Sequence, residues 1–154
     1  MALPTLFYGV PSGCSFGSIV ALEWLGQPYQ LCRIAMPEDV TTAEPEKQAL
    51  RNLGARKVVS AHANLEALMG DTPWLLGNHR TLADAYFIGI ARWTRYHEVL
   101  DRRDYPKLQG LFERLEADVG VRFAHSIEKG ETPQGSGALQ GHIRLAEALR
   151  RLPA

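Results

Sequence analysis

The sequence predicts an α-rich α/β protein in which a short strand–helix–strand unit precedes a helical domain. Residues 3–8 and 29–34 have strand character, and the segment between them, residues 15–25, has helical periodicity. From residue 44 onward the apolar residues follow a helical period. Hydrophobic residues make up 45% of the 154 residues, so the chain can form a packed core.

The first unit is bounded by clear turn residues. Two glycines and a proline within residues 9–13 predict a turn after the first strand, and Gly26 with Pro28 ends the helix. A strand–helix–strand connection of this length is almost always right-handed, so we expect parallel strands. Residues 1–43 are assigned to this first domain.

Residues 44–154 are assigned to the helical domain. Pro45 suits a first helical turn, and a long apolar stripe runs from there to Gly70. Further helices are expected at residues 82–100, 105–115 and 121–127. The glycine-rich residues 130–141 predict a flexible linker, followed by a terminal amphipathic helix at residues 142–152.

Composition excludes several classes of protein. The 17 basic and 17 acidic residues give no net charge, which argues against a nucleic-acid partner. No apolar run approaches the length of a membrane span, and the first residues lack a secretory pattern, so a cytoplasmic protein without a membrane partner is expected. The two cysteines form no disulfide framework, and no two of the five histidines have a ligand spacing on one helix, so no metal site is predicted.

The most informative residues lie in the first turn. Ser12 and Gly13, which are candidate substrate-binding residues, precede Cys14 and Ser15. Cys14 and Ser15 open the first helix, where unpaired N–H groups and the helix dipole favour an anion. A cysteine there can ionise readily, and Ser15 can hydrogen-bond a bound thiolate. An equally weighted alternative is that Ser12 or Ser15 only caps the helix while Cys14 is a small buried residue.

Three stretches in order along the chain resemble bacterial glutathione transferases, nearest to the beta-like group with a Cys-Ser pair. They are LFYGVPSGCS (residues 6–15) continuing into ALEWLGQPY (residues 21–29), then PWLLGNHRTLADAY (residues 73–86), and YPKL (residues 105–108). The resemblance implies a thioredoxin-like first domain and an all-α C-terminal domain of the transferase type. It also implies glutathione as co-substrate, a small-molecule electrophile, a catalytic role for Cys14 and Ser15, and a homodimer.

Part of the family pattern is missing. The family continues after its second strand with a helix, two strands and a helix that hold a cis-proline and an acidic-Ser pair for glutathione. Here the chain passes from the second strand almost directly into helical sequence. The thioredoxin-like domain is therefore expected to be a truncated βαβ fragment, and contacts to glutathione would have to come from another chain. In the family the first strand is interior, so its exposed edge here predicts a homodimer.

The remaining candidates are weighed individually. Thr81 and Asp84 have the spacing of a capping box, which predicts a structural role for Asp84 rather than a catalytic one. Trp93 and Tyr96 are candidates to line a substrate pocket, and the favoured alternative for both is packing in the core. Tyr8 is a candidate thiolate donor, by resemblance to other branches of the family, and otherwise a strand-end aromatic residue.

Three functions follow from these observations. One is conjugation or thiol exchange of glutathione with small electrophiles, which the missing part of the glutathione site would impair. The alternative is a non-catalytic helical scaffold for binding or dimerisation, derived from a transferase. The third is a monothiol redox protein in which Cys14 is glutathionylated without a full glutathione site.

Overall fold

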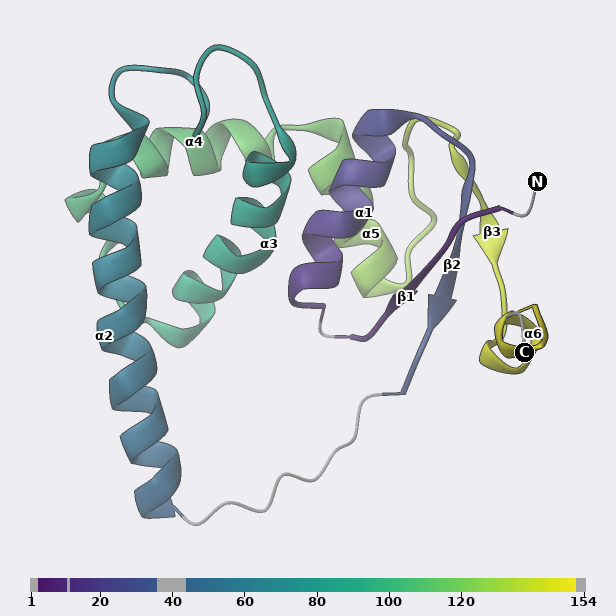
Figure 1. Ribbon diagram of the computed structural model, residues 1–154, viewed down its shortest axis with the longest axis horizontal. Coiled ribbons are helices and arrows are strands. Elements are labelled where there is room, and N and C mark those ends of the chain that lie inside the picture. Colours follow the sequence, from purple (N-terminus) through teal and green to yellow (C-terminus); the bar gives the residue numbers. More distant parts are fainter. Residues whose placement is uncertain (1–2, 11, 36–43, 152–154) are drawn as a thin grey trace.

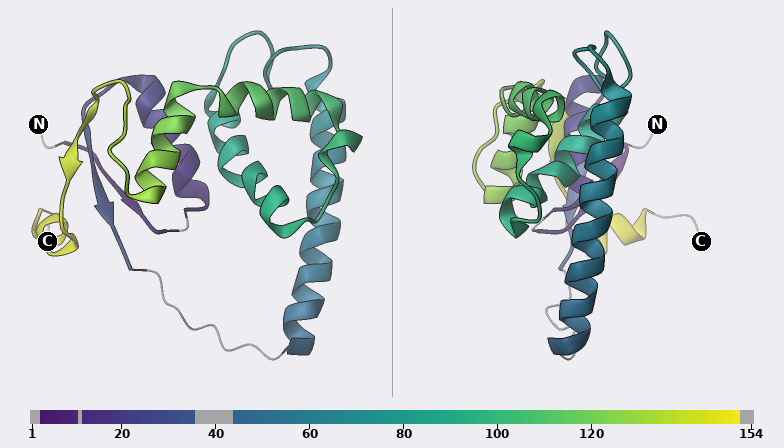
Figure 2. Two further views of the ribbon diagram at one scale, coloured as in Figure 1. Left: turned by 180° about the vertical axis from the view of Figure 1, so that it is seen from behind. Right: turned by 90° about the vertical axis from the view of Figure 1, so that its left-hand side faces the viewer.

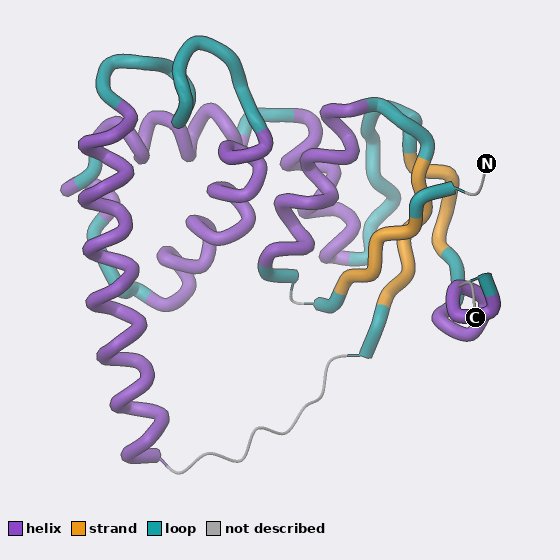
Figure 3. The backbone as a smooth tube through the Cα atoms, viewed as in Figure 1, coloured by secondary structure: helices purple, strands orange, loops and turns teal. Residues whose placement is uncertain are grey.

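The computed structural model describes residues 3–10, 12–35 and 44–151. Pro11, Leu152 and the domain boundary at residue 43 lie outside these ranges. The elements, in chain order, are β1 (Thr5–Tyr8), α1 (Cys14–Leu25), β2 (Tyr29–Arg33), α2 (Glu44–Met69), α3 (Leu82–His97), the 3₁₀ turn η1 (Arg102–Asp104), α4 (Pro106–Glu116), α5 (Val119–Lys129), β3 (Leu139–His142) and α6 (Leu145–Arg150). Helices dominate, and the strands gather at one side of the molecule (Figure 3).

The predicted βαβ unit is present and its two strands are parallel. β1 and β2 pair in register from Thr5 opposite Gln30 to Tyr8 opposite Arg33. α1 connects them and ends at Gly26, whose φ of 62° is the left-handed conformation that glycine adopts without strain. The sheet, however, has three strands in the order β1-β2-β3, so the prediction of two strands is wrong.

The third strand comes from the segment expected to be a flexible linker. β3 pairs parallel to the outer edge of β2, where the Tyr29 N–H donates to Ala138 at 3.1 Å and the Ile143 N–H donates to Leu31 at 2.9 Å. Gly135 packs so tightly that an added Cβ would lie 2.3 Å from the Phe123 ring. Gly135 thus permits close packing, whereas Gly137 and Gly141 adopt positive φ angles of 83° and 120°. The backbone groups of β2 supply the hydrogen-bond partners that order the strand.

The two faces of the sheet are covered by different helices. Side chains alternate along a strand, so Tyr29 and Leu31 point into the main core, which α1 and α5 share, while Cys32 points the other way. Cys32 packs there with Ile143 and with Ala148 of α6. Figure 2 shows α5 and α6 on opposite sides of the sheet, so the terminal helix folds back onto its own chain.

α1 packs on the sheet, and α3 packs on α1, so these two helices link the strands to the rest of the helical domain. α2 lies farthest from the strands (Figure 1). The apolar stripe predicted along α2 is mostly exposed: only His62 and Met69 are buried, and Leu50 and Leu53 are 62% and 43% exposed. The sequence pattern was amphipathic, but little of the described chain packs on that face. No helix among the described residues is both long and apolar enough to cross a bilayer.

Candidate functional site

Cys14 is the first residue of α1, and its side chain is exposed. Gly13 is the N-cap and offers no side chain, so the first backbone N–H groups of the helix have no side-chain cap. The alternative in which Ser12 or Ser15 caps the helix and Cys14 is buried is therefore wrong. The Cys14 sulfur is therefore open to solvent, beside backbone N–H groups that carry no side-chain cap.

The turn before Cys14 is fixed by Ser12, which is buried. Its N–H and its hydroxyl both donate to Glu128 Oε1, at 2.6 and 2.8 Å. Its carbonyl accepts a hydrogen bond from Arg92. Ser12 thus ties the β1–α1 turn to α3 and α5 instead of contacting solvent.

Arg92 and Glu128 complete this anchor. The Arg92 guanidinium donates to both Glu128 oxygens, at 2.7 and 3.0 Å, and lies over the Phe16 ring at 4.2 Å. Burial opposes the charge on Glu128, but the hydrogen bonds from Arg92 and Ser12 outweigh it and lower the pKa of Glu128. The turn that carries Cys14 is therefore held by an ionised pair.

Tyr86 of α3 brings its hydroxyl to the sulfur. The distance between Tyr86 Oη and Cys14 Sγ is 3.2 Å. The hydrogen bond with Cys14 raises the pKa of Tyr86, which keeps the phenol protonated. Among the described residues, Tyr86 is the one side chain that hydrogen-bonds this sulfur.

Two glycines set how closely α1 approaches α3. A Cβ added to Gly17 would lie 2.4 Å from the Ala85 carbonyl oxygen, and one added to Gly89 would lie 2.9 Å from the Gly17 nitrogen. Neither position has room for a side chain. This close crossing places Tyr86, the residue after Ala85, within reach of Cys14.

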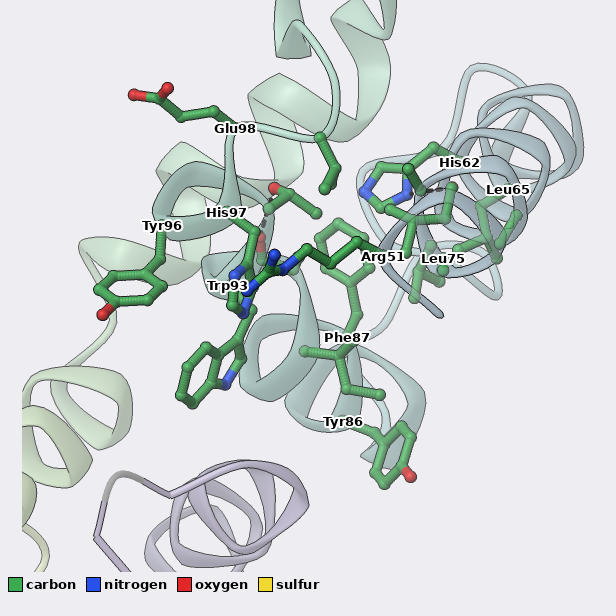
Figure 4. Close-up of a pocket in the computed structure, with 18 of the residues that line it drawn as sticks. Arg51, His62, Leu65, Leu75, Tyr86, Phe87, Trp93, Tyr96, His97 and Glu98 are labelled. Carbon is green, nitrogen blue, oxygen red and sulfur yellow. Dashed lines mark hydrogen bonds between the residues drawn. The ribbon is translucent and has the colours of Figure 1, made fainter. Parts of the chain in front are cut away.

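An apolar cavity of about 1070 Å³ lies between α2 and α3. Figure 4 shows His62 and Leu65 on the α2 side and Trp93, Tyr96 and His97 on the α3 side. The wall also includes Tyr86, so the cavity and the Cys14 sulfur share a neighbour. The cavity has the size and apolar lining to hold a small apolar molecule near Cys14.

Some predicted residues lie at this site and others do not. Trp93 and Tyr96 line the cavity, and Tyr96 is 77% exposed, so the core-packing interpretation fails for it. Tyr8 is buried, and its ring lies 6.2 Å from that of His142. Ser15 lies in the first turn of α1. Tyr8 is the last residue of β1, as the interpretation of a strand-end aromatic residue expects, and the hydroxyl beside the Cys14 sulfur belongs to Tyr86.

The predicted capping box is present at the start of α3. The Asp84 carboxylate accepts from the Thr81 N–H at 2.7 Å, and the Thr81 side chain accepts from the helix backbone in return. Asp84 is fully buried and also accepts from the Leu75 N–H at 2.9 Å. It therefore joins the loop before α3 to the helix as well as capping it. Among the described residues, no cluster of three or more His, Cys, Asp or Glu side chains could hold a metal ion.

Sequence reasoning missed Tyr86, Arg92 and Glu128 as parts of the site. Tyr86 is the last residue of the stretch at residues 73–86 that carries the family resemblance, but its spacing does not place it beside Cys14. Arg92 and Glu128 had no signal in the sequence, because they are 36 residues apart and meet only through folding.

Comparisons with known proteins agree with this architecture. Residues 30–118, more than half of the chain, match the family model described as "Glutathione S-transferase, C-terminal domain". A glutathione-S-transferase from Xylella fastidiosa shares the fold, with a TM-score of 0.66 and 18% identity over 83% of this chain and 99% of that chain. No curated protein matches.

Two further solved structures match more narrowly. They are BphK, a bacterial glutathione transferase solved as a ternary complex (24% identity, TM-score 0.45), and a glutathione transferase from Methylococcus capsulatus strain Bath (28% identity, TM-score 0.44). Each match covers 59% of this chain and 43% of the other. By the family match over most of its helical part, the chain belongs to the glutathione S-transferase family.

Proposed function

We propose that this glutathione transferase-like protein exchanges thiols at Cys14, forming and releasing a mixed disulfide between Cys14 and glutathione. The observation that carries the proposal is the exposed Cys14 sulfur at the start of α1, 3.2 Å from a tyrosine hydroxyl that lines an apolar cavity. A small apolar partner, either an electrophile or the second half of a disulfide, would occupy the cavity.

The chemistry needs only groups that the site and its substrates supply. The Cys14 thiolate attacks the glutathione sulfur of a disulfide, a new sulfur–sulfur bond forms, and the other thiol leaves as its thiolate. A second glutathione thiolate then attacks the glutathione sulfur bound to Cys14. Oxidised glutathione leaves and the Cys14 thiolate is restored. Conjugation of glutathione to an electrophile is the variant in which Cys14 and Ser15 hold the glutathione sulfur.

Glutathione would be held by fewer contacts than in the complete family pattern. The uncapped N–H groups at the start of α1 and the side chain of Ser15 are available on this chain. We propose that the remaining contacts come from a second copy in a homodimer, which would also cover the free edge of β1. A reducing cytoplasm, which keeps Cys14 free and supplies glutathione, is the compartment this chemistry needs.

The test is to incubate the protein with oxidised glutathione and to measure intact mass. We expect one glutathione on the wild type and on Cys32→Ser, since Cys32 is fully buried, and none on Cys14→Ser. Added reduced glutathione should return the wild type to its free mass. A chlorodinitrobenzene assay in parallel measures conjugation. Glutathione on Cys14→Ser, or none on the wild type, would contradict the proposal.

A scaffold without turnover is the second candidate, and one observation favours it. Large apolar side chains on α2 are exposed, as expected for a surface that binds another protein: Leu50, Leu53, Val59 and Leu68. Retention on immobilised glutathione together with turnover separates the two. A protein that neither binds glutathione nor reacts with it, yet associates through α2, would be the scaffold.

A further inference from the structure

The hydrogen bond between Tyr86 and Cys14 joins two parts of the chain that are 72 residues apart. From this geometry we infer that Tyr86 is a catalytic residue, whose hydroxyl donates to the Cys14 sulfur, favours its thiolate and speeds its departure from a mixed disulfide. The inference rests on the proposed function and adds a residue to it.

The direction of the hydrogen bond follows from acidity. A thiol ionises near pH 8.5 and a phenol near pH 10, so the sulfur loses its proton first and the phenol then donates to it. The hydrogen bond with Cys14 also raises the pKa of Tyr86, which agrees with a phenol that keeps its proton and donates a hydrogen bond to the sulfur. A donor to a charged sulfur is worth more than a donor to a neutral thiol, so the bond favours ionisation.

Both partners are held by backbone packing. A Cβ on Gly17 would lie 3.0 Å from the Tyr86 Cα, so the absence of a side chain at Gly17 is what allows α3 to lie this close to α1. On the other side, Ser12 is bound through its N–H and its hydroxyl to Glu128. The backbone at both positions is therefore fixed, and only the side-chain rotamers of Tyr86 and Cys14 have to be set for the hydroxyl to meet the sulfur.

Tyr86 should affect the two half-reactions unequally. In the attack by Cys14, a lower thiol pKa raises the thiolate fraction but reduces its nucleophilicity, so the two effects partly cancel. In the release, Cys14 is the leaving group, and a lower pKa makes it leave faster. The Cys14–glutathione bond breaks, its electron pair stays on the Cys14 sulfur, and the Tyr86 hydroxyl hydrogen-bonds the sulfur as charge develops.

The variant is Tyr86→Phe, which removes only the hydroxyl from a half-exposed side chain. The matched control is Tyr105→Phe, since the Tyr105 hydroxyl contacts the Val59 carbonyl at 3.5 Å and lies outside the cavity lining. The rate of alkylation by iodoacetamide is measured against pH, with Cys14→Ser as the blank. Release of the mixed disulfide by reduced glutathione is then timed at neutral pH.

We expect the midpoint of the alkylation profile to rise by roughly 0.5 to 1 pH unit in Tyr86→Phe and to stay in place in Tyr105→Phe. Release should slow about threefold to tenfold, more than formation does. An unshifted midpoint, or equal slowing of both half-reactions, would overturn the role of Tyr86. The alkylation arm uses no glutathione, so a wild type that forms no mixed disulfide overturns the proposed function alone.

Discussion

Arg92 and Glu128 form a two-point ion pair, at 2.7 and 3.0 Å, that joins α3 to α5 beside the turn leading to Cys14. Both side chains are about 15% exposed, so water screens the pair only partly. Glu128 also accepts both hydrogen bonds of Ser12. The Glu128 carboxylate thus holds the turn through Ser12, and the Arg92 guanidinium neutralises the charge of that carboxylate.

Glu128→Gln should destabilise the protein by about 2 kcal/mol, because Arg92 loses its counter-charge and the amide offers one acceptor oxygen where the carboxylate offers two. Chemical denaturation measures the change. Glu131→Gln, at an exposed carboxylate two residues after α5, is the control and should stay within about 0.5 kcal/mol of the wild type. Equal midpoints for the two variants would show that the pair contributes nothing.

The Glu128 carboxylate also makes the free energy of unfolding depend on pH in the acidic range. The pKa of Glu128 is lower in the folded than in the unfolded chain, so its contribution is present above the unfolded value, near pH 4.5, and is lost as pH falls through the folded value. The free energy of unfolding should therefore fall between roughly pH 5 and pH 3. Glu128→Gln should fall less steeply over that range. Some slope should remain, since the His125 hydrogen bond also lowers the pKa of Glu116.

Gly17→Ala and Gly54→Ala should change stability in opposite directions. A methyl group on Gly17 meets the Ala85 carbonyl at 2.4 Å, and backbone cannot give way easily, so we expect a loss of about 2 kcal/mol or more. Gly54 lies on exposed α2 with nothing within 4 Å, so alanine there should add about 0.5–1 kcal/mol. Thermal unfolding of both variants measures this. A stabilised Gly17→Ala would refute the close crossing of α1 and α3.

The two residues of the capping box, Thr81 and Asp84, should contribute unequally to the free energy of unfolding. Thr81→Ala removes one capping oxygen and should cost about 1 kcal/mol. Asp84→Ala leaves the N–H groups of Thr81 and Leu75 without their acceptor in a buried place, and should cost about 3 kcal/mol. Denaturant midpoints decide this, with Thr81→Ser as the variant that keeps the oxygen. Equal losses of stability in Thr81→Ala and Asp84→Ala would mean that the hydrogen bond from the Leu75 N–H to Asp84 contributes nothing to stability. Neither loss should abolish the alkylation of Cys14 while the protein stays folded.

The free edge of the sheet should make the protein associate. Within the described residues β1 pairs only with β2, and Phe7 on β1 is 38% exposed. An uncharged, partly apolar edge favours pairing with a second copy. Light scattering at micromolar concentration should give more than a monomer mass, and Phe7→Lys should lower it. Leu76→Lys, at an exposed leucine away from the sheet, is the control and should not. A clean wild-type monomer would contradict this prediction.

Local sequence patterns predicted most elements of this fold within a few residues. The turn before Cys14, the stop at Gly26 and the capping box at Thr81 and Asp84 all depend on interactions between residues close in sequence. Such interactions are readable from spacing, because helix periods and caps have fixed offsets. Cys14 was placed at the start of α1 for the same reason.

The third strand and the neighbours of Cys14 could not be read in this way. β3 forms because the edge of β2 offers backbone partners more than a hundred residues away, which overrides the flexibility expected from its glycines. Tyr86 reaches the sulfur because the close crossing of α1 and α3 at Gly17 and Gly89 sets one helix against the other. Spacing along the chain carries no information about such contacts, since the free energy that forms them comes from burial and packing between distant segments.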